Sequence, residues 1–243
     1  MANMRPVHIL RILLWFGLLA FGGILLWGYA RSHPEDLPWT ELDLAQPIGA
    51  FTGRKLTGTG GEQCRLLLAR AGIRFNALPP RSASEQCGYD DAVRFRPGGA
   101  VRIAFAPRDV GTRCPVAAAL ALWEWHVVQP AAIKHLGSQV ATIDHLGSYS
   151  CRRMYNRPDA GWSEHATANA LDIAGFRLSD GTRISVLDHW DEAGPRGAFL
   201  RDVRDGACGL FATVLSPDYN AAHRDHLHLD QAERGEMGWR ACR

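Results

Sequence analysis

The first long apolar stretch of the chain covers residues 12–30, which carry no charge and lie between Arg11 and Arg31. A helix of this length crosses the hydrocarbon core of a bilayer. Basic residues precede the stretch, which favours an N-terminus in the cytoplasm and the remainder of the chain outside. We therefore expect residues 1–11 in the cytoplasm, a transmembrane signal anchor over residues 12–30 in the inner membrane, and the folded part in the periplasm. The alternatives are a signal peptide that is cleaved on export and a buried core helix.

Beyond the anchor, the apolar positions first lack any period and then follow helical and strand spacing. Residues 31–60 are rich in Pro, Gly and Thr and predict a periplasmic linker. Residues 61–243 carry the periodic segments and predict one domain, with an irregular stretch over 74–96. The spacing predicts helices over 62–71, 115–127, 130–136 and 197–211, strands over 101–106, 140–149, 170–176 and 226–230, and a hairpin over 178–186. We expect an α+β fold in which a small antiparallel sheet is flanked by helices.

Composition narrows the possible partners. The 243 residues include 27 Lys and Arg against 25 Asp and Glu, so the charge is nearly balanced. The chain has no basic run interleaved with aromatic residues, and nucleic acid is therefore not an expected partner.

Six cysteines fall after the apolar stretch, without any Cys-x-x-Cys pair. An even number confined to the exported part predicts disulfides formed in an oxidising compartment. Six cysteines allow 15 connectivities. Our expectation is sequential pairing, Cys64 with Cys87, Cys114 with Cys151 and Cys208 with Cys242.

Two motifs far apart in the chain combine histidines with a carboxylate. His165 precedes Asp172 in the first, and the second is His226-Leu-His228. Zinc accepts imidazole nitrogen and carboxylate oxygen, and a catalytic zinc site uses three protein ligands so that one position stays open. Residues i and i+2 of a strand face the same way, so we expect both histidines of the second motif to face one cleft. We assign His165, Asp172 and His228 as ligands of one zinc ion, although such a set also holds other divalent ions.

Residues around the second motif are candidates for proton transfer in a hydrolytic reaction. His226 is placed to take a proton from water or to stabilise an oxyanion. Asp225, three residues before His228, is either a base or a carboxylate that orients a ligand imidazole. His223 is a further catalytic candidate, with a surface role as the alternative.

Arg152, in the segment Gly-Ser-Tyr-Ser-Cys-Arg, is the candidate cation. It has three interpretations: stabilisation of a developing oxyanion, bidentate pairing with a substrate carboxylate, or an ordinary surface arginine beside a disulfide.

These motifs carry a resemblance to known proteins. Ser163-x-His165-x-x-Ala-x-Ala-x-Asp172 together with His226-x-His228 resembles the zinc peptidases of the lysostaphin, D-Ala-D-Ala carboxypeptidase and hedgehog type. Within that group, the run Trp123-Glu-Trp-His-Val-Val-Gln-Pro-Ala, the Gly-Ser-Tyr-Ser-Cys-Arg segment and the run Pro217-Asp-Tyr-Asn-Ala-Ala-His-Arg-Asp-His-Leu-His-Leu-Asp230 resemble the bacterial extensin-like C-terminal family. That similarity covers roughly Cys64 to Asp230.

The pattern His223-x-Asp225-His226-x-His228 is also similar to that of penicillin-insensitive murein endopeptidases. This similarity implies the same ligand set and a catalytic His226. Two departures accompany it: Asp225 stands where the wider group has Glu, and Ala168 stands where the first motif usually has Gly.

The resemblance implies a zinc-dependent peptidoglycan hydrolase that cleaves D,D or L,D amide bonds in stem-peptide cross-links. The alternatives are a D,D-carboxypeptidase or dipeptidase, and a wall-binding domain without catalysis. The expected partners are peptidoglycan stem peptides, the inner membrane and a protein activator.

Overall fold

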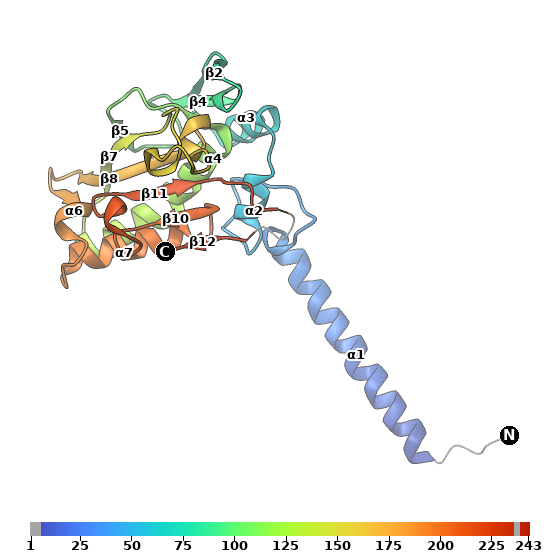
Figure 1. Cartoon of the computed structure of the whole chain (residues 1–243). Coiled ribbons are helices and arrows are strands. Elements are labelled where there is room, and N and C mark those ends of the chain that lie inside the picture. Colours follow the sequence, from blue (N-terminus) through green and yellow to red (C-terminus); the bar gives the residue numbers. More distant parts are fainter. Residues whose placement is uncertain (1–5, 236–238) are drawn as a thin grey trace.

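A computed structural model of the chain describes residues 6–235 and 239–243. Helix α1 (Pro6–Ser32) extends away from the domain as a single exposed rod (Figure 1). It is long and apolar enough to span a membrane or to act as a signal sequence. A second apolar run, Cys114–Leu136, passes the same test of length and composition, but most of it is buried inside the domain and forms core helices.

The segment predicted as a linker is folded and packs onto the domain. A short 3₁₀ turn (Pro34–Asp36) follows α1, and helix α2 (Thr52–Thr57) packs against α4 (Cys114–Trp123). Leu44 and Leu56 are almost completely buried. A helix of six residues contains too few turns to produce a visible apolar period, which explains why its sequence indicates a linker.

The main sheet runs across the middle of the domain, with strand order β12-β10-β11-β8-β7-β5 among the described residues and β9 paired to β8. The strands are β5 (Ala104–Ala106), β7 (Val140–Gly147), β8 (Ala170–Leu178), β9 (Arg183–Ser185), β10 (Thr213–Leu215), β11 (Leu227–Asp230) and β12 (Ala241–Cys242). The central pairings are antiparallel, as predicted, whereas β5–β7 and β10–β12 are parallel. The α+β class with antiparallel sheets is confirmed.

Two strand boundaries differ from the prediction for identifiable reasons. The strand expected over 101–106 begins only at Ala104, because the backbone N–H groups of Arg102 and Ile103 donate to the carboxylate of Glu124 instead. The strand expected over 140–149 ends at Gly147, whose φ of 123° turns the chain out of the extended conformation.

Helices cover the sheet and enclose the core. Helix α4 continues through a π-helical segment (Glu124–Val128) into α5 (Gln129–Leu136), which packs against α7 (Pro195–Ala207). Trp123 is fully buried and donates its indole N–H to the Val203 carbonyl at 2.8 Å. Pro130 is the second residue of α5, directly after the π-helical segment. The remaining helices are α3 (Gly61–Arg70) and α6 (Val186–His189).

The stretch 74–96, expected to be irregular, contains four short strands. These are β1 (Phe75–Ala77), β2 (Arg81–Ser84), β3 (Cys87–Tyr89) and β4 (Ala92–Phe95), and β6 (Thr112–Arg113) pairs with β4. Strands of three or four residues are too short for alternation to be recognised, so the prediction for this stretch was wrong.

All six cysteines form disulfides, and one of the three expected pairs is confirmed. Cys208 pairs with Cys242, but the other bonds are Cys64–Cys114 and Cys87–Cys151. The two sequential pairs were wrong because tertiary packing selects the partner: α3 packs against α4, and the β2–β3 hairpin lies against the segment that follows β7.

Candidate metal centre and cleft

The structure brings together the three residues assigned as metal ligands. His165 lies on a 3₁₀ turn (Glu164–Thr167), Asp172 on β8 and His228 on β11. Asp172 and His228 are directly opposite each other in the antiparallel β8–β11 pair. Opposite residues project to the same face of a sheet, which brings these two side chains into contact.

The turn that carries His165 depends on local polar and backbone features. The backbone N–H of His165 donates to the Ser163 hydroxyl at 3.3 Å, as at a helix N-terminus. Ala168 ends the turn with a φ of 55°, in the left-handed region that glycine adopts more easily. An L-residue in this conformation costs roughly 1–2 kcal/mol more than glycine would.

The separations of the three donor groups fit a metal ion. His165 Nε2 lies 3.2 Å from His228 Nδ1 and 3.1 Å from Asp172 Oδ2, and His228 Nδ1 lies 2.9 Å from Asp172 Oδ1. Ligands bonded to tetrahedral zinc at about 2.0–2.1 Å would be about 3.3 Å apart. All three residues are buried and could hold a metal ion. We call His165, Asp172 and His228 the metal group.

Each ligand histidine has its other ring nitrogen fixed by an oxygen that accepts only. His165 Nδ1–H donates to the Ser148 carbonyl at 2.6 Å, and His228 Nε2–H donates to Asp230 Oδ2 at 2.9 Å. In the neutral rings these bonds leave lone pairs on His165 Nε2 and His228 Nδ1, which face each other and the Asp172 carboxylate. Lone pairs at this separation repel unless a cation, a metal ion or a proton, lies between them.

The pKa values of His228 and Asp172 also indicate that this site favours a positive charge. Burial opposes charge on His228, but the hydrogen bonds and negative charges of Asp172 and Asp230 outweigh it and raise its pKa to about 9. Burial would likewise raise the pKa of Asp172, yet the hydrogen bonds from His165 and His228 lower it well below its usual range. The site therefore attracts a cation into the space between these side chains.

The structure places the other histidines of the second motif beside the metal group. His226 precedes β11, and its Nε2 lies 3.7 Å from Asp172 Oδ1. Asp225 Oδ1 lies 2.8 Å from His226 Nδ1, so Asp225 orients His226 and not a ligand imidazole.

His223 Nδ1 lies 2.8 Å from Asn220 Oδ1. Burial, assisted by the charges of neighbouring His226 and His228, lowers the pKa of His223 to about 4, which keeps its ring neutral at physiological pH.

A cleft of about 660 Å³ opens over the metal group. Arg152 lines it, together with Arg234 and Arg243 from the C-terminal part of the chain. Its aromatic and apolar lining residues include Met154, Tyr155, Trp162, Leu215 and Tyr219. The cleft is large enough for a peptide segment and has both charged and apolar walls.

Several residues of the site were not anticipated. Asp230 lies two residues after His228 on the same face of β11 and contacts it. This His-x-Asp spacing is visible in the sequence. Ser148 contacts His165 through its backbone carbonyl, and Arg243 lines the cleft because it follows the two-residue strand β12. Neither feature leaves a signal in the sequence.

Comparison with known proteins identifies the family. A family model described as the extensin-like protein C-terminus matches residues 62–243. The chain belongs to the extensin-like C-terminal family. No curated protein and no solved structure matches the chain. The family description names no reaction.

Proposed function

We propose that this extensin-like protein is a zinc-dependent peptidase that hydrolyses amide bonds in the stem-peptide cross-links of peptidoglycan. The observation that carries the proposal is the convergence of His165, Asp172 and His228 at 2.9–3.2 Å, with both imidazole tautomers fixed, beneath a cleft of peptide size. Catalytic zinc sites use such a set of three nitrogen and oxygen ligands.

The residues around this group have separable roles in the proposed reaction. The three ligands would hold the ion, which supplies Lewis-acid activation of water for attack on an amide carbonyl. His226 is the candidate general base, since its Nε2 points to the metal group while Asp225 holds its Nδ1. Asp225 thereby fixes the tautomer that leaves Nε2 free to accept a proton.

The substrate is argued from location and from the sequence motifs. Helix α1 and three disulfides fit a protein anchored in the inner membrane with its domain on the periplasmic side, where peptidoglycan lies. The arrangement of ligands and adjacent histidines is similar to the motifs of the lysostaphin, D-Ala-D-Ala carboxypeptidase and hedgehog type, and to murein endopeptidases that cut D,D or L,D bonds.

A second candidate function is favoured by the arginines of the cleft. A D,D-carboxypeptidase or dipeptidase must bind the terminal carboxylate of its substrate, and Arg152 lines the cleft beside the metal group. Such an enzyme would release D-Ala from monomeric stem peptides and would not separate dimers.

The test uses the full chain in detergent, with disulfides formed and zinc added. Purified cross-linked muropeptide dimers and monomers are incubated with the protein and with a His228→Ala variant, and products are identified by mass spectrometry. Conversion of dimers to monomers by the wild type alone is the expected result. Release of D-Ala from monomers alone would replace the proposal by the carboxypeptidase. Absence of turnover by a folded, zinc-loaded protein would favour a wall-binding role or a required activator.

A further inference from the structure

Two guanidinium groups of the cleft follow strands on opposite sides of the strand pair β8–β11. Arg152 follows β7, and Arg243 follows β12. In the strand order β12-β10-β11-β8-β7, the metal ligands lie on the central strands β11 and β8 or beside them. The two arginines therefore line the same cleft from the two sides of the metal group.

Neither guanidinium has a hydrogen-bond or ion-pair partner among the residues that the structure describes. Most of the other charged side chains in the cleft already have hydrogen-bond partners. Glu164 accepts from Asn169 at 2.6 Å, and Arg234 donates to Thr213 at 2.6 Å. Asp172 and Asp230 pair with the ligand histidines, and Glu233 also lines the cleft. The N–H donors of Arg152 and Arg243 are therefore available to a planar acceptor such as a carboxylate.

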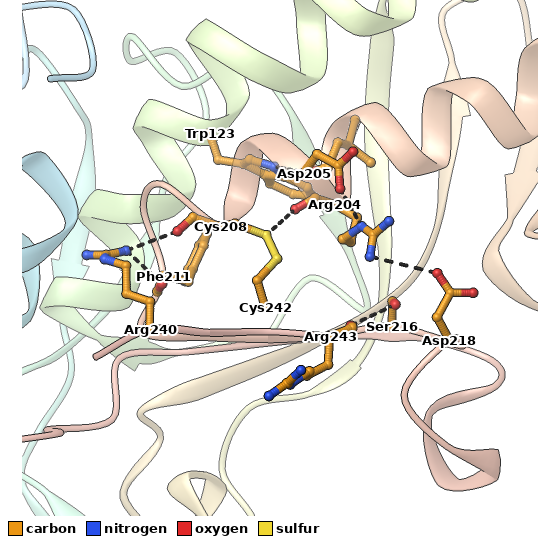
Figure 2. Close-up of a disulfide and its surroundings, with 11 residues drawn as sticks. Trp123, Arg204, Asp205, Cys208, Phe211, Ser216, Asp218, Arg240, Cys242 and Arg243 are labelled. Atoms are coloured by element: carbon orange, nitrogen blue, oxygen red, sulfur yellow. Dashed lines mark hydrogen bonds and ion pairs between the residues drawn. A yellow bond between two sulfur atoms is a disulfide. The ribbon is translucent and has the colours of Figure 1, made fainter. Parts of the chain in front are cut away.

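A disulfide bond holds Arg243 in its place. Cys242 bonds to Cys208, at the end of α7, and Arg243 comes next in the chain. Figure 2 shows the Arg243 side chain projecting from the strand on the side away from the disulfide, as successive residues of an extended chain do. The backbone is fixed as well: the Arg243 N–H donates to the Val214 carbonyl, and Ser216 donates to the Arg243 carbonyl through both its N–H and its hydroxyl, at 2.8–2.9 Å.

Arg152 is held by the same kind of arrangement. It follows Cys151, which bonds to Cys87 on the β2–β3 hairpin. The Arg152 carbonyl accepts from the Ser163 N–H at 3.2 Å, which ties it to the turn that carries His165. Each unpaired arginine of the cleft is thus the residue directly after a disulfide-bonded cysteine.

We propose that Arg243 is a specificity-determining residue that binds a carboxylate of the peptide substrate, while Arg152 binds a second carboxylate across the metal group. The inference rests on the proposed function, because it takes the metal group as the reaction centre. It assigns the substrate class: a peptide that carries carboxylates on both sides of the scissile amide and therefore continues through the cleft in both directions.

The test compares two forms of one substrate on zinc-loaded full-length protein. Purified cross-linked muropeptide dimers are used as isolated and after conversion of their carboxylates to primary amides. The variants are Arg243→Gln, Arg243→Lys and, as a matched control, Arg70→Gln at the exposed end of α3.

One charge-assisted hydrogen bond corresponds to roughly a ten- to hundredfold change in binding. We expect Arg243→Gln to raise KM for the carboxylate dimers by about that factor, with little change in kcat or in zinc content.

The amide form separates recognition from general damage. Wild-type protein should handle amidated dimers at least as poorly as Arg243→Gln handles native ones, because amidation removes the partners of both arginines. Arg243→Lys should restore part of the affinity for native dimers, and Arg70→Gln should behave as wild type. An unchanged KM in Arg243→Gln, or an equal loss on both dimer forms, would overturn the inference.

Binding is measured separately so that the inference and the proposed function can fail independently. Calorimetric titration of a His226→Ala background with native dimers reports recognition without turnover. A loss of affinity on adding Arg243→Gln supports the inference even if the wild type hydrolyses nothing. Binding that is insensitive to Arg243 overturns it even if hydrolysis occurs, and absence of binding overturns both.

The disulfide gives an additional test. In a Cys208→Ser and Cys242→Ser double variant, KM for native dimers should rise towards the Arg243→Gln value, and adding Arg243→Gln should change it little further. Fully additive effects would show that the bond does not position the arginine.

Discussion

His228 and Asp230 lie two residues apart on β11, and the His228 Nε2–H donates to Asp230 Oδ2 at 2.9 Å. The pairing turns His228 Nδ1 towards His165 and raises the electron density on that nitrogen. Metal-bound histidines commonly rely on a carboxylate in this position, and its loss costs about 10–100-fold in metal affinity or activity. Asp230 therefore belongs with the three donors to the candidate metal site.

We expect Asp230→Asn to weaken zinc binding by about 10–100-fold without unfolding the protein. The asparagine keeps the shape of the side chain but removes the charge that supports the imidazole. Competition with a chelator of known affinity measures the change. Asp159→Asn, on an exposed loop, is the control, and equal zinc affinity in the two variants would contradict a supporting role for Asp230.

Metal removal should destabilise the wild type and leave a ligand variant unaffected. Zinc at a hundred times its dissociation constant adds about 2.7 kcal/mol to the free energy of unfolding when it binds only the folded state. We expect the thermal midpoint of the wild type to rise on adding zinc and to fall back with chelator, while His165→Ala shows no response. A comparable zinc response in His165→Ala would place the binding elsewhere.

The contact between Asp225 and His226 predicts a graded loss of activity. Removing a general base costs typically 10²–10⁴-fold in rate, so His226→Ala should lose kcat in that range. Asp225→Asn keeps the imidazole but loosens its orientation, and we expect a smaller loss in kcat. Zinc stoichiometry should stay at one in both variants. If Asp225→Asn were the more damaging change, Asp225 itself would be the better candidate for the base.

Glu124 predicts a pH dependence of stability. Burial raises the pKa of its carboxyl, although backbone N–H groups of Arg102 and Ile103 donate to it. As the pH rises above the ordinary pKa of 4.5, the folded state retains more of this proton than the unfolded state does. The free energy of unfolding therefore falls across the interval up to the raised pKa.

Glu124→Gln removes that proton linkage. We expect the stability of the variant relative to the wild type to be higher at pH 7 than at pH 4, measured by urea denaturation with chelator present throughout. Glu62→Gln, on the exposed side of α3, serves as the control and should show no such difference. A pH-independent offset in Glu124→Gln would rule out titration of this carboxyl as the cause.

The disulfide pattern is open to direct chemical test. Peptide mapping under non-reducing conditions should recover Cys64 with Cys114 and Cys87 with Cys151. Both sulfurs of the first pair are buried between α3 and α4. Replacing that pair by alanine should lower the free energy of unfolding by about 2–5 kcal/mol. Fragments that join Cys64 to Cys87 would instead support sequential pairing.

The sequence predicts those parts of the site that depend on local spacing. His165 and Asp172 share one motif and His228 lies in another, and strand periodicity indicates which residues share a face within each strand. That Asp172 and His228 face the same side follows from the register of β8 and β11, which the structure supplies. The contact between His228 and Asp230 could have been predicted in the same way, because residues i and i+2 of a strand share a face. The contact of Ser148 with His165 could not have been predicted, because every residue has a backbone carbonyl.

The parts that escaped prediction depend on contacts between distant segments. Strand β12 has two residues and no period, yet its parallel pairing with β10 brings Arg243 to the cleft. Cys64 meets Cys114 because two helices pack together, and no spacing along the chain encodes that choice. Glu124 accepts from the backbone N–H groups of Arg102 and Ile103, which lie 22 and 21 residues before it, and β5 therefore begins only at Ala104.

The folded connection between α1 and the domain limits where the domain can work. A flexible linker of the predicted length would have let the domain wander over an r.m.s. distance of about 30 Å. Instead, Tyr29 donates to Asp36 at 2.6 Å, Asp36 accepts from the Ala50 N–H at 2.9 Å, and α2 then packs on the core. These contacts tie the base of α1 to the domain. If α1 spans a bilayer, they hold the cleft at a nearly constant distance from the membrane surface, and under the proposed function a cross-link would be cleaved only where it passes at that distance.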